Sequence, residues 1–249
     1  MSYPRTVSAA LSRIRKFSLA ICVFPLILLA SGCASLPAGA NRVAHDPFEP
    51  MNRAIFAVND TIDAALLKPV ARVYVDYVHE GVREVFGNIF GNVADVWTAV
   101  NQLLQGKPVE AVGDLSRFVI NSTLGFFGVA DVASSFGFEK HREDFGQTLG
   151  VWGLGSGPYL VLPIFGPSSF RDSAGFGLDY ATDPVRAVND IAIRNSGSVV
   201  RLVDTRAKLF PGEKLIEGAS LDKYSFIRDG YLQRRRNLVY DGNPPEPKQ

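Results

Sequence analysis

The stretch from Asp144 to Asp172 constrains the fold of this chain more than any other part. It combines five aromatic side chains with many glycines and three prolines, and it carries no charge between Asp144 and Arg171. Each glycine lowers helix propensity by about 1 kcal/mol relative to alanine, and each proline removes a backbone donor, so the stretch cannot form one continuous helix. It is also too apolar for a solvated loop and too broken for a strand in a regular sheet. The N–H and C=O groups of an irregular apolar segment need hydrogen-bond partners, so the segment must be covered by other parts of the protein or must line a cavity. On composition alone, we favour a segment that crosses an ordinary protein core.

A second apolar segment broken by glycines runs from Leu124 to Phe138, and the polar cluster His141 to Asp144 separates the two. One such segment fits an ordinary core. Two of them are more irregular apolar backbone than a chain of this length usually carries, and they indicate a membrane or lipid surface.

The first 32 residues have the layout of a bacterial export signal. Basic residues precede a 14-residue apolar stretch, Phe17 to Ala30, which is short for a membrane span of about 20 residues. Small residues then lead to Cys33 in a sequence that resembles a lipobox, although Ala30 stands where Leu is usual. We expect cleavage between Gly32 and Cys33, with a diacylglycerol and an N-acyl chain (commonly palmitate) on Cys33. An ordinary secretory signal with an incidental cysteine is the alternative.

The charge balance does not suggest nucleic-acid binding. The chain carries 26 basic and 25 acidic residues, and removal of the signal, which contains four basic and no acidic residues, leaves 22 against 25, a net charge of −3. With 47% hydrophobic residues the mature chain is long enough for one sizeable core. We expect a tether at residues 33–45, one domain at residues 46–240, and a disordered Pro-rich tail at residues 241–249.

Apolar residues recur every three or four positions along most of the mature chain, which predicts amphipathic helices. Asp46 is expected to cap the first helix, and Lys68 and Pro69 to break it. The sequence shows no alternating strand series and no internal repeat, so the predicted class is all-α. The expected helices lie at residues 46–67, 70–77, 80–105, 108–124, 170–181, 184–210 and 220–238.

No catalytic or metal-binding pattern stands out, and we expect neither an enzyme nor a metal or other cofactor. The three histidines are not spaced as metal ligands. Ser156 does not lie in a nucleophile elbow, because Leu154 and Pro158 occupy the positions where glycines are needed. His141 with Glu143 or Asp144 offers a general base, but a polar loop cluster is the simpler interpretation.

Several motifs resemble the MlaA (VacJ) family of outer-membrane lipoproteins. They occur in the family's order and cover roughly residues 46–240. The motifs are Asp46-Pro-Phe-Glu-Pro-Met-Asn-Arg, Asn101-Gln-Leu-Leu-Gln-Gly-Lys-Pro, Phe145-Gly-Gln-Thr-Leu-Gly and Gly155-Ser-Gly-Pro-Tyr-Leu-Val-Leu-Pro-Ile-Phe-Gly-Pro-Ser-Ser-Phe-Arg-Asp.

The resemblance implies a ring-like arrangement of amphipathic helices around a lipid passage. It implies a lipoprotein anchored on the inner-leaflet side of the outer membrane, to which Ala34 after the lipidated Cys33 also points. Such a protein removes mislocalised phospholipid from the outer leaflet and passes it to a periplasmic carrier protein, which maintains lipid asymmetry. It also implies association with a trimeric porin.

Two groups of residues are candidates for the passage. Aromatic side chains are expected to contact acyl chains, and glycines are expected to let the backbone curve about the channel. The aromatic candidates are Phe126, Phe127, Trp152, Tyr159 and Phe165, and the glycines are Gly125, Gly128, Gly150, Gly153, Gly155 and Gly157. Arg234 to Arg236 either touch lipid phosphates or, more commonly for such a triplet, form a solvated basic face. A porin scaffold and an envelope lipid hydrolase are alternative functions.

Overall fold

This computed structural model describes residues 46–213 and 222–246, so the expected signal peptide, Cys33 and tether lie outside the described residues. The described residues belong to one unit, Val43–Gln249. They are mainly helical, which confirms the predicted class, with one additional two-stranded hairpin. The elements are α2 (Glu49–Ile62), η1 (Asp63–Leu67), α3 (Lys68–Tyr77), α4 (Glu80–Leu104), α5 (Pro108–Thr123), α6 (Val132–Ser135), α7 (Phe145–Val151), β1 (Tyr159–Leu162), β2 (Gly166–Ser169), α8 (Phe170–Thr182), η2 (Pro184–Ala187), α9 (Ile191–Ala207) and α11 (Lys223–Val239).

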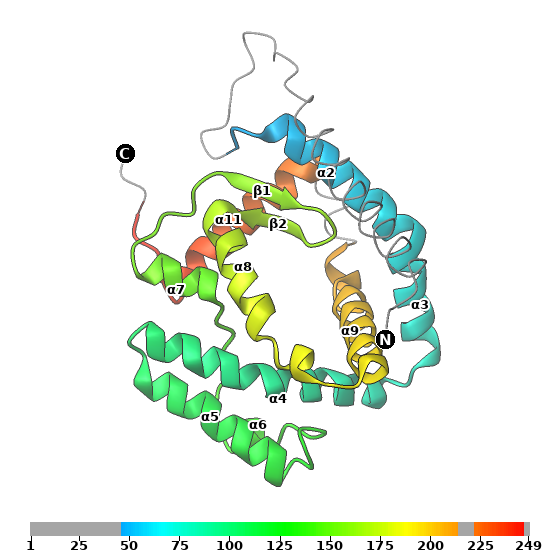
Figure 1. The fold of residues 1–249 in the computed structure, drawn as a ribbon, viewed down its shortest axis with the longest axis vertical. Coiled ribbons are helices and arrows are strands. Elements are labelled where there is room, and N and C mark those ends of the chain that lie inside the picture. The colour runs from blue at the N-terminus through cyan, green and yellow to red at the C-terminus, as the bar shows by residue number, and fades with distance from the viewer. Residues whose placement is uncertain (1–45, 214–221, 247–249) are drawn as a thin grey trace, which may run out of the picture. The chain divides into compact units, whose positions relative to one another are not determined.

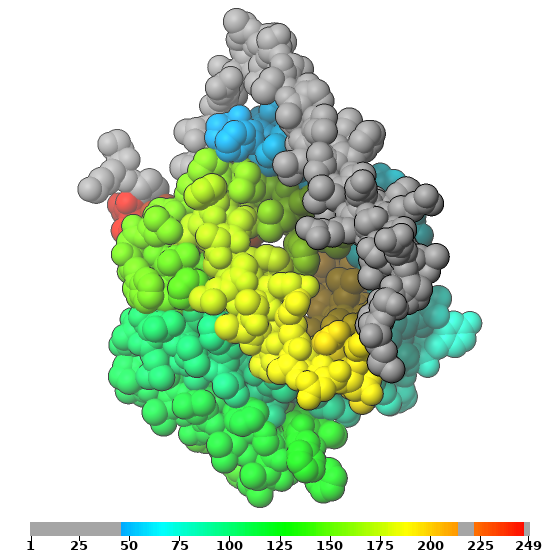
Figure 2. All heavy atoms as spheres, viewed as in Figure 1, coloured from blue at the N-terminus to red at the C-terminus, as the bar shows by residue number. Residues whose placement is uncertain are grey.

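The helices of this unit surround an opening between α8 and α9 (Figure 1). The arc of α2, η1 and α3 forms one side, and α9 packs against α3. Helix α4 packs against α5, α7 and α9, and the hairpin joins α2 to α8 and α11. Figure 2 shows the surface hollowed between the yellow α8 and the orange α9. The predicted ring-like arrangement is therefore confirmed, whereas a lipid passage remains a prediction.

The predicted helix break at Lys68 and Pro69 is wrong. Helix α2 continues through the π-helical turn η1 into α3, and the Lys68 N–H donates to the Asp63 carbonyl. Pro69 lies in the first turn of α3, where its missing N–H and its ring are tolerated because the π-turn widens the preceding backbone. The chain therefore bends at the proline without leaving the helix.

The hairpin falls in the stretch that was expected to be too broken for a strand. Strands β1 and β2 pair antiparallel from Tyr159 with Ser169 to Leu162 with Gly166. Each strand has four residues, so the glycines and prolines bound the strands or, as with Pro167, fit a strand that has only one partner. Ile164 in the turn and Gly166 adopt positive φ angles of 69° and 81°.

Two asparagines of α2 pair with the free edge of β1. Asn52 donates to the Tyr159 carbonyl and accepts from the Val161 N–H, both at 2.9 Å. Asn59 donates to the Leu162 carbonyl at 2.9 Å and accepts from the Ile164 N–H at 2.8 Å. Seven helical residues rise about 10.5 Å and three strand residues about 10 Å, so the two spacings match. Each amide thus takes the place of a neighbouring strand.

Two predicted boundaries are also wrong. Asp46 does not cap the first helix. It is buried and accepts from Asn52 at 2.8 Å and from the Tyr224 hydroxyl at 2.5 Å, while α2 begins after Phe48. Asp183 starts only the short turn η2, and Asp190 caps a separate helix, α9. Helix α11 begins after its cap Asp222, and the predicted start at Ser220 lies outside the described residues.

We predict that Asn52→Ala lowers the free energy of unfolding by about 2–4 kcal/mol, because it leaves a buried N–H and a buried C=O of β1 without partners. Thermal unfolding followed by circular dichroism in detergent measures the loss. Asn59→Ala is the matched control, with the same pairing pattern but a partly exposed site, and we expect a smaller loss. If both variants lose the same free energy of unfolding, the burial of the Asn52 site does not determine the loss and this prediction is wrong.

Candidate functional site

The polarity of the described unit is inverted relative to that of a typical soluble domain. The largest fully buried side chains are mainly polar or charged, whereas large apolar side chains of the helices are exposed. Soluble proteins rarely expose so much apolar surface, so this exterior suits contact with a membrane or another protein. No helix within the described ranges is long and apolar enough to cross a bilayer. The exposed set includes Val58, Ile62 and Leu66 of the α2–η1 arc, Val70 and Val73 of α3, Val109, Val112, Leu115 and Val119 of α5, and Ile191, Val199 and Leu202 of α9.

Arg117 illustrates how charged side chains of the interior are paired. Its side chain is fully buried, and Nη2 donates to both carboxylate oxygens of Asp131 at 2.8 and 2.9 Å. Nη1 donates to the Phe138 carbonyl at 2.6 Å. Burial alone would raise the pKa of Asp131, which also caps α6, but hydrogen bonds from Ser134, Asn121 and Arg117 outweigh it and lower the pKa to about 2. The arginine thus fixes the glycine-rich segment between α5 and α7.

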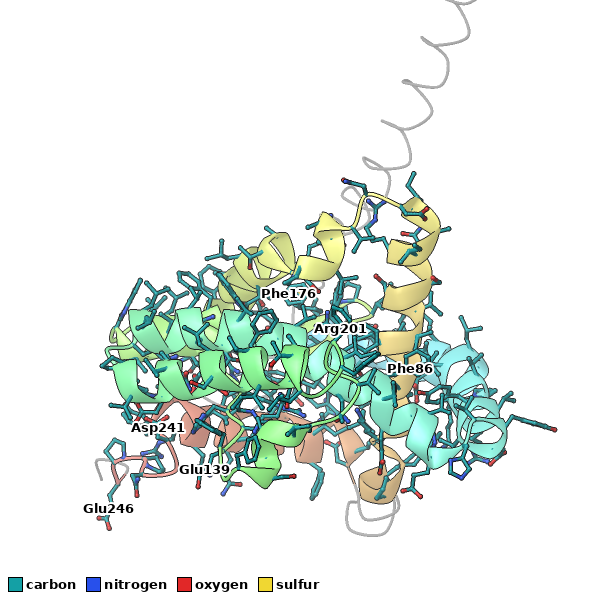
Figure 3. The ribbon with its side chains drawn as sticks, turned by 90° about the horizontal axis from the view of Figure 1, so that it is seen from below. Phe86, Glu139, Phe176, Arg201, Asp241 and Glu246 are labelled. Atoms are coloured by element: carbon teal, nitrogen blue, oxygen red, sulfur yellow. The ribbon has the colours of Figure 1, made fainter. Side chains whose placement is uncertain are left out.

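A cavity of 200 Å³ lies where the hairpin, α8 and α11 meet, and we call it the hairpin cavity. Phe165 in the hairpin turn lies 4.7 Å, centroid to centroid, from Phe176 of α8. Phe176 stacks in turn on Tyr180, whose ring carries the Arg186 guanidinium at 4.0 Å. Figure 3 shows Phe176, with Phe86 of α4 and Arg201 of α9, toward the middle of the unit. One wall of the hairpin cavity is therefore aromatic.

Another part of the hairpin cavity lining is ionic. Arg235 of α11 is 12% exposed and binds two carboxylates that come from different helices. Its guanidinium donates to Asp144, the cap of α7, at 2.5 and 2.8 Å, and to Asp172 of α8 at 3.0 and 2.8 Å. We call these three residues the Arg235 clamp. The Tyr231 hydroxyl also donates to Asp172, at 2.7 Å.

The clamp shifts the ionisation of its carboxylates. Burial by itself raises the pKa of Asp172, but the bonds from Arg235 outweigh that effect and lower the pKa to about 2. The pKa of Asp144 is lowered in the same way, against the effect of burial. Asp179, also in the cavity lining, has its pKa raised by burial, although Trp97 Nε1 donates to it at 2.7 Å. The cavity therefore offers fixed charges beside aromatic rings.

The clamp corrects the expectation for the arginine triplet. Arg235 is neither on a solvated face nor free for a phosphate, because both carboxylates occupy its donors. Arg234 is exposed, and Arg236 donates to the Pro245 carbonyl. The three residues thus point to different surroundings, because successive helix positions are about 100° apart.

The predicted passage residues do not come together at one place. Phe165 lines the hairpin cavity, whereas Gly150, Gly153 and Gly155 line a second cavity on the other side of the clamp. Gly157 borders neither cavity, and its positive φ of 67° places it against Phe170.

The other aromatic candidates lie elsewhere. Phe126 and Phe127, at 76% and 80% exposure, form the connection between α5 and α6 with positive φ angles. Trp152 is 56% exposed, and its Nε1 donates to the Leu104 carbonyl at 2.9 Å. Tyr159 is fully buried in a core cluster with Val161 and Tyr224, so its assignment as an acyl-chain contact is wrong.

Two of the candidate glycines beside α5 have a packing role. A Cβ on Gly125 would lie 2.2 Å from the Ala130 carbonyl oxygen, and one on Gly128 would lie 2.9 Å from the Asn92 side-chain nitrogen. Both glycines therefore allow close approach in the tight connection that follows α5, rather than curvature about a channel.

Sequence reasoning missed the residues that give the hairpin cavity its character. Motifs and spacing do not single out Phe176, Asp179 or Tyr231 as site residues. They mark Asp172 only as an end of the central stretch, and Asp144 as the other end and as a candidate general base with His141. The sole sequence signal is position: two aspartates bound an otherwise almost uncharged segment, and carboxylates at the ends of buried backbone require a buried partner such as Arg235.

The polar groups that could support general-base chemistry are held in separate pairs. His141 Nδ1 lies 2.9 Å from Asp114 Oδ2, and Glu143 accepts from Gln105 at 2.9 Å. Asp144 belongs to the clamp. Over residues 46–213 and 222–246, no hydrogen bond joins Ser156 to a histidine, and no cluster of three His, Cys, Asp or Glu side chains is placed to hold a metal ion.

A family model described as MlaA lipoprotein matches residues 44–238. The chain belongs to this family. It is 32% identical over 226 residues to the intermembrane phospholipid transport system lipoprotein MlaA of Escherichia coli K12, covering 89% of this chain and 88% of that protein. The protein of the same name from Haemophilus influenzae is 31% identical over 211 residues, covering 82% and 83%.

A solved structure has a matching fold. It comes from a study of the "Structural basis for maintenance of bacterial outer membrane lipid asymmetry", and it superimposes with a TM-score of 0.68 at 32% identity. The match covers 78% of this chain and 98% of the other. The ring of helices seen here is thus shared with a structure whose study concerned outer-membrane lipids.

We predict that Arg235→Gln destabilises this MlaA-family chain by about 1.5–3 kcal/mol, because Asp144 loses its charged partner and buried Asp172 keeps only Arg171 and the Tyr231 hydroxyl. Arg234→Gln, one residue away and exposed, is the control and should change stability by no more than about 0.5 kcal/mol. Chemical denaturation in detergent compares the two. Similar small effects for both variants would contradict the clamp.

We also predict that the clamp weakens in acid. The pKa of Asp172 falls from its ordinary 3.8 to about 2 on folding, so its stabilising contribution is present above pH 4 and is lost as the pH falls toward 2. The stability advantage of the wild type over Asp172→Asn should therefore be largest near neutral pH and shrink between pH 4 and pH 2. Denaturation of both proteins at several pH values measures it, and a constant difference would rule the effect out.

Proposed function

We propose that this MlaA-family chain is an outer-membrane lipoprotein that takes mislocalised phospholipid from the outer leaflet and passes it to a soluble periplasmic carrier. The proposal rests on the hairpin cavity, whose lining contains both aromatic rings and charged side chains. A phospholipid headgroup is unfavourable in hydrocarbon, and acyl chains are unfavourable in water. A path for a whole phospholipid must therefore offer both surroundings side by side, as the hairpin cavity does with Phe165, Phe176 and the Arg235 clamp in one lining.

The inverted polarity supports placement in a membrane. Amphipathic helices can lie in one leaflet with their apolar faces toward lipid, and buried polar groups are then turned inward. The exposed valines and leucines of α2, α3 and α5 would face the acyl chains of the inner leaflet. A diacylglycerol and an N-acyl chain on Cys33, after cleavage of residues 1–32, would add an almost permanent anchor.

The partners in this proposal are a phospholipid, a trimeric porin and a periplasmic lipid-binding protein. The names of the curated relatives, which refer to an intermembrane phospholipid transport system, support the lipid. The porin and the carrier rest on the family resemblance. The chain needs no catalytic group for this activity, because the lipid is moved without a covalent bond being made or broken.

We predict that Phe165→Ala with Phe176→Ala fails to restore lipid asymmetry in a deletion strain, because it removes the aromatic wall from the path. Loss of this apolar contact is worth about 2–4 kcal/mol, so transport should fall at least tenfold. Headgroup labelling of intact cells measures the outer-leaflet phospholipid. Phe226→Ala, an exposed aromatic outside both cavities, is the matched control and should restore the wild-type level.

Further complementing copies separate the alternatives. Cys33→Ala should fail if anchoring is required. If the cavity variant restores asymmetry in full, the transport proposal is wrong and a porin scaffold is favoured. Ser156→Ala and His141→Ala should both complement, and loss of function in either would favour a lipid hydrolase.

A further inference from the structure

The second cavity has a volume of 480 Å³, within the usual range of ligand pockets, and is lined by the glycine segment after α7 and by α11. We call it the glycine cavity. Asp172 and Arg235 line both this cavity and the hairpin cavity, so the clamp forms the wall between them. The proposed transport path through the hairpin cavity does not use the glycine cavity.

A buried cation faces the glycine cavity with a free donor. Arg171 is 6% exposed, and its Nε and Nη2 donate to Asp172 Oδ1 at 3.0 and 2.8 Å. Its Nη1 makes no hydrogen bond to any described residue, although it lines the cavity beside Gly150, where an added Cβ would lie 2.7 Å from it. This nitrogen reaches the cavity and has no partner among the described residues, so it can donate to an acceptor that enters from the cavity.

Two backbone donors lie on the same lining. In the segment that leads out of α7, the N–H groups of Gly153 and Leu154 bond back to the carbonyls of Gly150 and Leu149. The N–H groups of the next two residues, Gly155 and Ser156, have no backbone or side-chain partner in the described part of the chain. A Cβ on Gly155 would meet nothing within 4 Å, so open space adjoins it.

The charge and the apolar lining define the ligand class. Asp144 and Asp172 balance Arg171 and Arg235, so the clamp wall is close to neutral, and Arg236 adds a positive charge that no described carboxylate neutralises. Apolar side chains, Leu154, Leu232 and Val239, complete the lining. The site thus combines donors for an anion with a surface for hydrocarbon.

We infer that the glycine cavity binds the phosphate group of a phospholipid. Arg171 Nη1 and the N–H groups of Gly155 and Ser156 donate to the phosphate oxygens, Arg236 provides a positive rim, and the glycerol end of the acyl chains rests on Leu154 and Leu232. The inference rests on the proposed function for the choice of a lipid. The shared chemistry is a phosphate oxyanion, which inorganic phosphate also offers.

The test measures binding to the purified mature, lipidated protein in detergent. The probes are phosphatidylglycerol, diacylglycerol, which lacks the phosphate, and inorganic phosphate. Phosphatidylglycerol should bind at least tenfold more tightly than either of the others, as expected for charge-assisted hydrogen bonds. Equal binding of diacylglycerol would overturn the phosphate contact, and equal binding of inorganic phosphate would overturn the lipid assignment.

Variants assign the effect to this cavity. Gly155→Leu fills the open space without a backbone clash, and Arg171→Gln removes the free donor; each should weaken phosphatidylglycerol binding about tenfold. Gly113→Leu, at a glycine of α5 that is also open, is the control and should bind as the wild type does. Thermal unfolding checks that the proteins fold, and unchanged binding by Gly155→Leu would refute the site.

The same comparison in the Phe165→Ala, Phe176→Ala background separates this inference from the proposed function. Gly155→Leu should still weaken phosphatidylglycerol binding about tenfold there, because Phe165 and Phe176 do not line the glycine cavity. If that loss persists while the double variant restores asymmetry in cells, the glycine cavity stands and the transport path fails. If the loss vanishes while the double variant is inactive in cells, the transport path stands and the glycine cavity fails.

Discussion

One arginine fixes how three helices meet in this MlaA-family chain. Arg235, near the C-terminal end of the described residues, binds the cap of α7 and the first turn of α8 at once. This is possible because α7 and α8 cross almost backbone to backbone: a Cβ on Gly175 would lie 2.4 Å from the Gly146 nitrogen. The glycine contact brings the two carboxylates within reach of a single guanidinium, and the guanidinium offsets the repulsion between them. Helix α11 is thereby joined to the middle of the sequence.

The polar interior follows from the apolar exterior. Helices with apolar outward faces must turn their polar faces toward one another, so buried amides and charges need partners from within the chain. Asn52 and Asn59 meet this need by pairing with β1, and Arg117 meets it by holding Asp131 and the Phe138 carbonyl. Such contacts are specific in geometry, whereas apolar contacts are not. They therefore define the ring of helices more closely than hydrophobic packing does.

Helical periodicity predicts the long helices well, because each has a continuous apolar stripe, as in α4 and α5. It fails where a competing interaction acts locally. Pro69 reads as a break because a π-turn leaves no mark in the hydrophobic pattern, and the hairpin escapes prediction because its outer partner is an asparagine pair on α2 rather than a third strand. The motif residues predict the family but not their roles. Tyr159 is a core residue, and the glycines and aromatic residues of the central stretch divide between two cavities because the Arg235 clamp separates them.

The clamp has the charge balance that a wall between two cavities requires. Together with Arg171, which also pairs with Asp172, the clamp comprises two arginines and two aspartates and is close to neutral, so this wall can border an apolar path without a net buried charge. The same Asp172 oxygen accepts from Arg171 and from Arg235, so a change in charge beside Arg171 alters the electrostatic environment of Arg235 as well. An oxyanion that accepts from Arg171 Nη1 in the glycine cavity would share the charge of Arg171 with Asp172, and Arg235 would then neutralise more of Asp172. The two cavities are therefore joined through one carboxylate, although they lie on different sides of it.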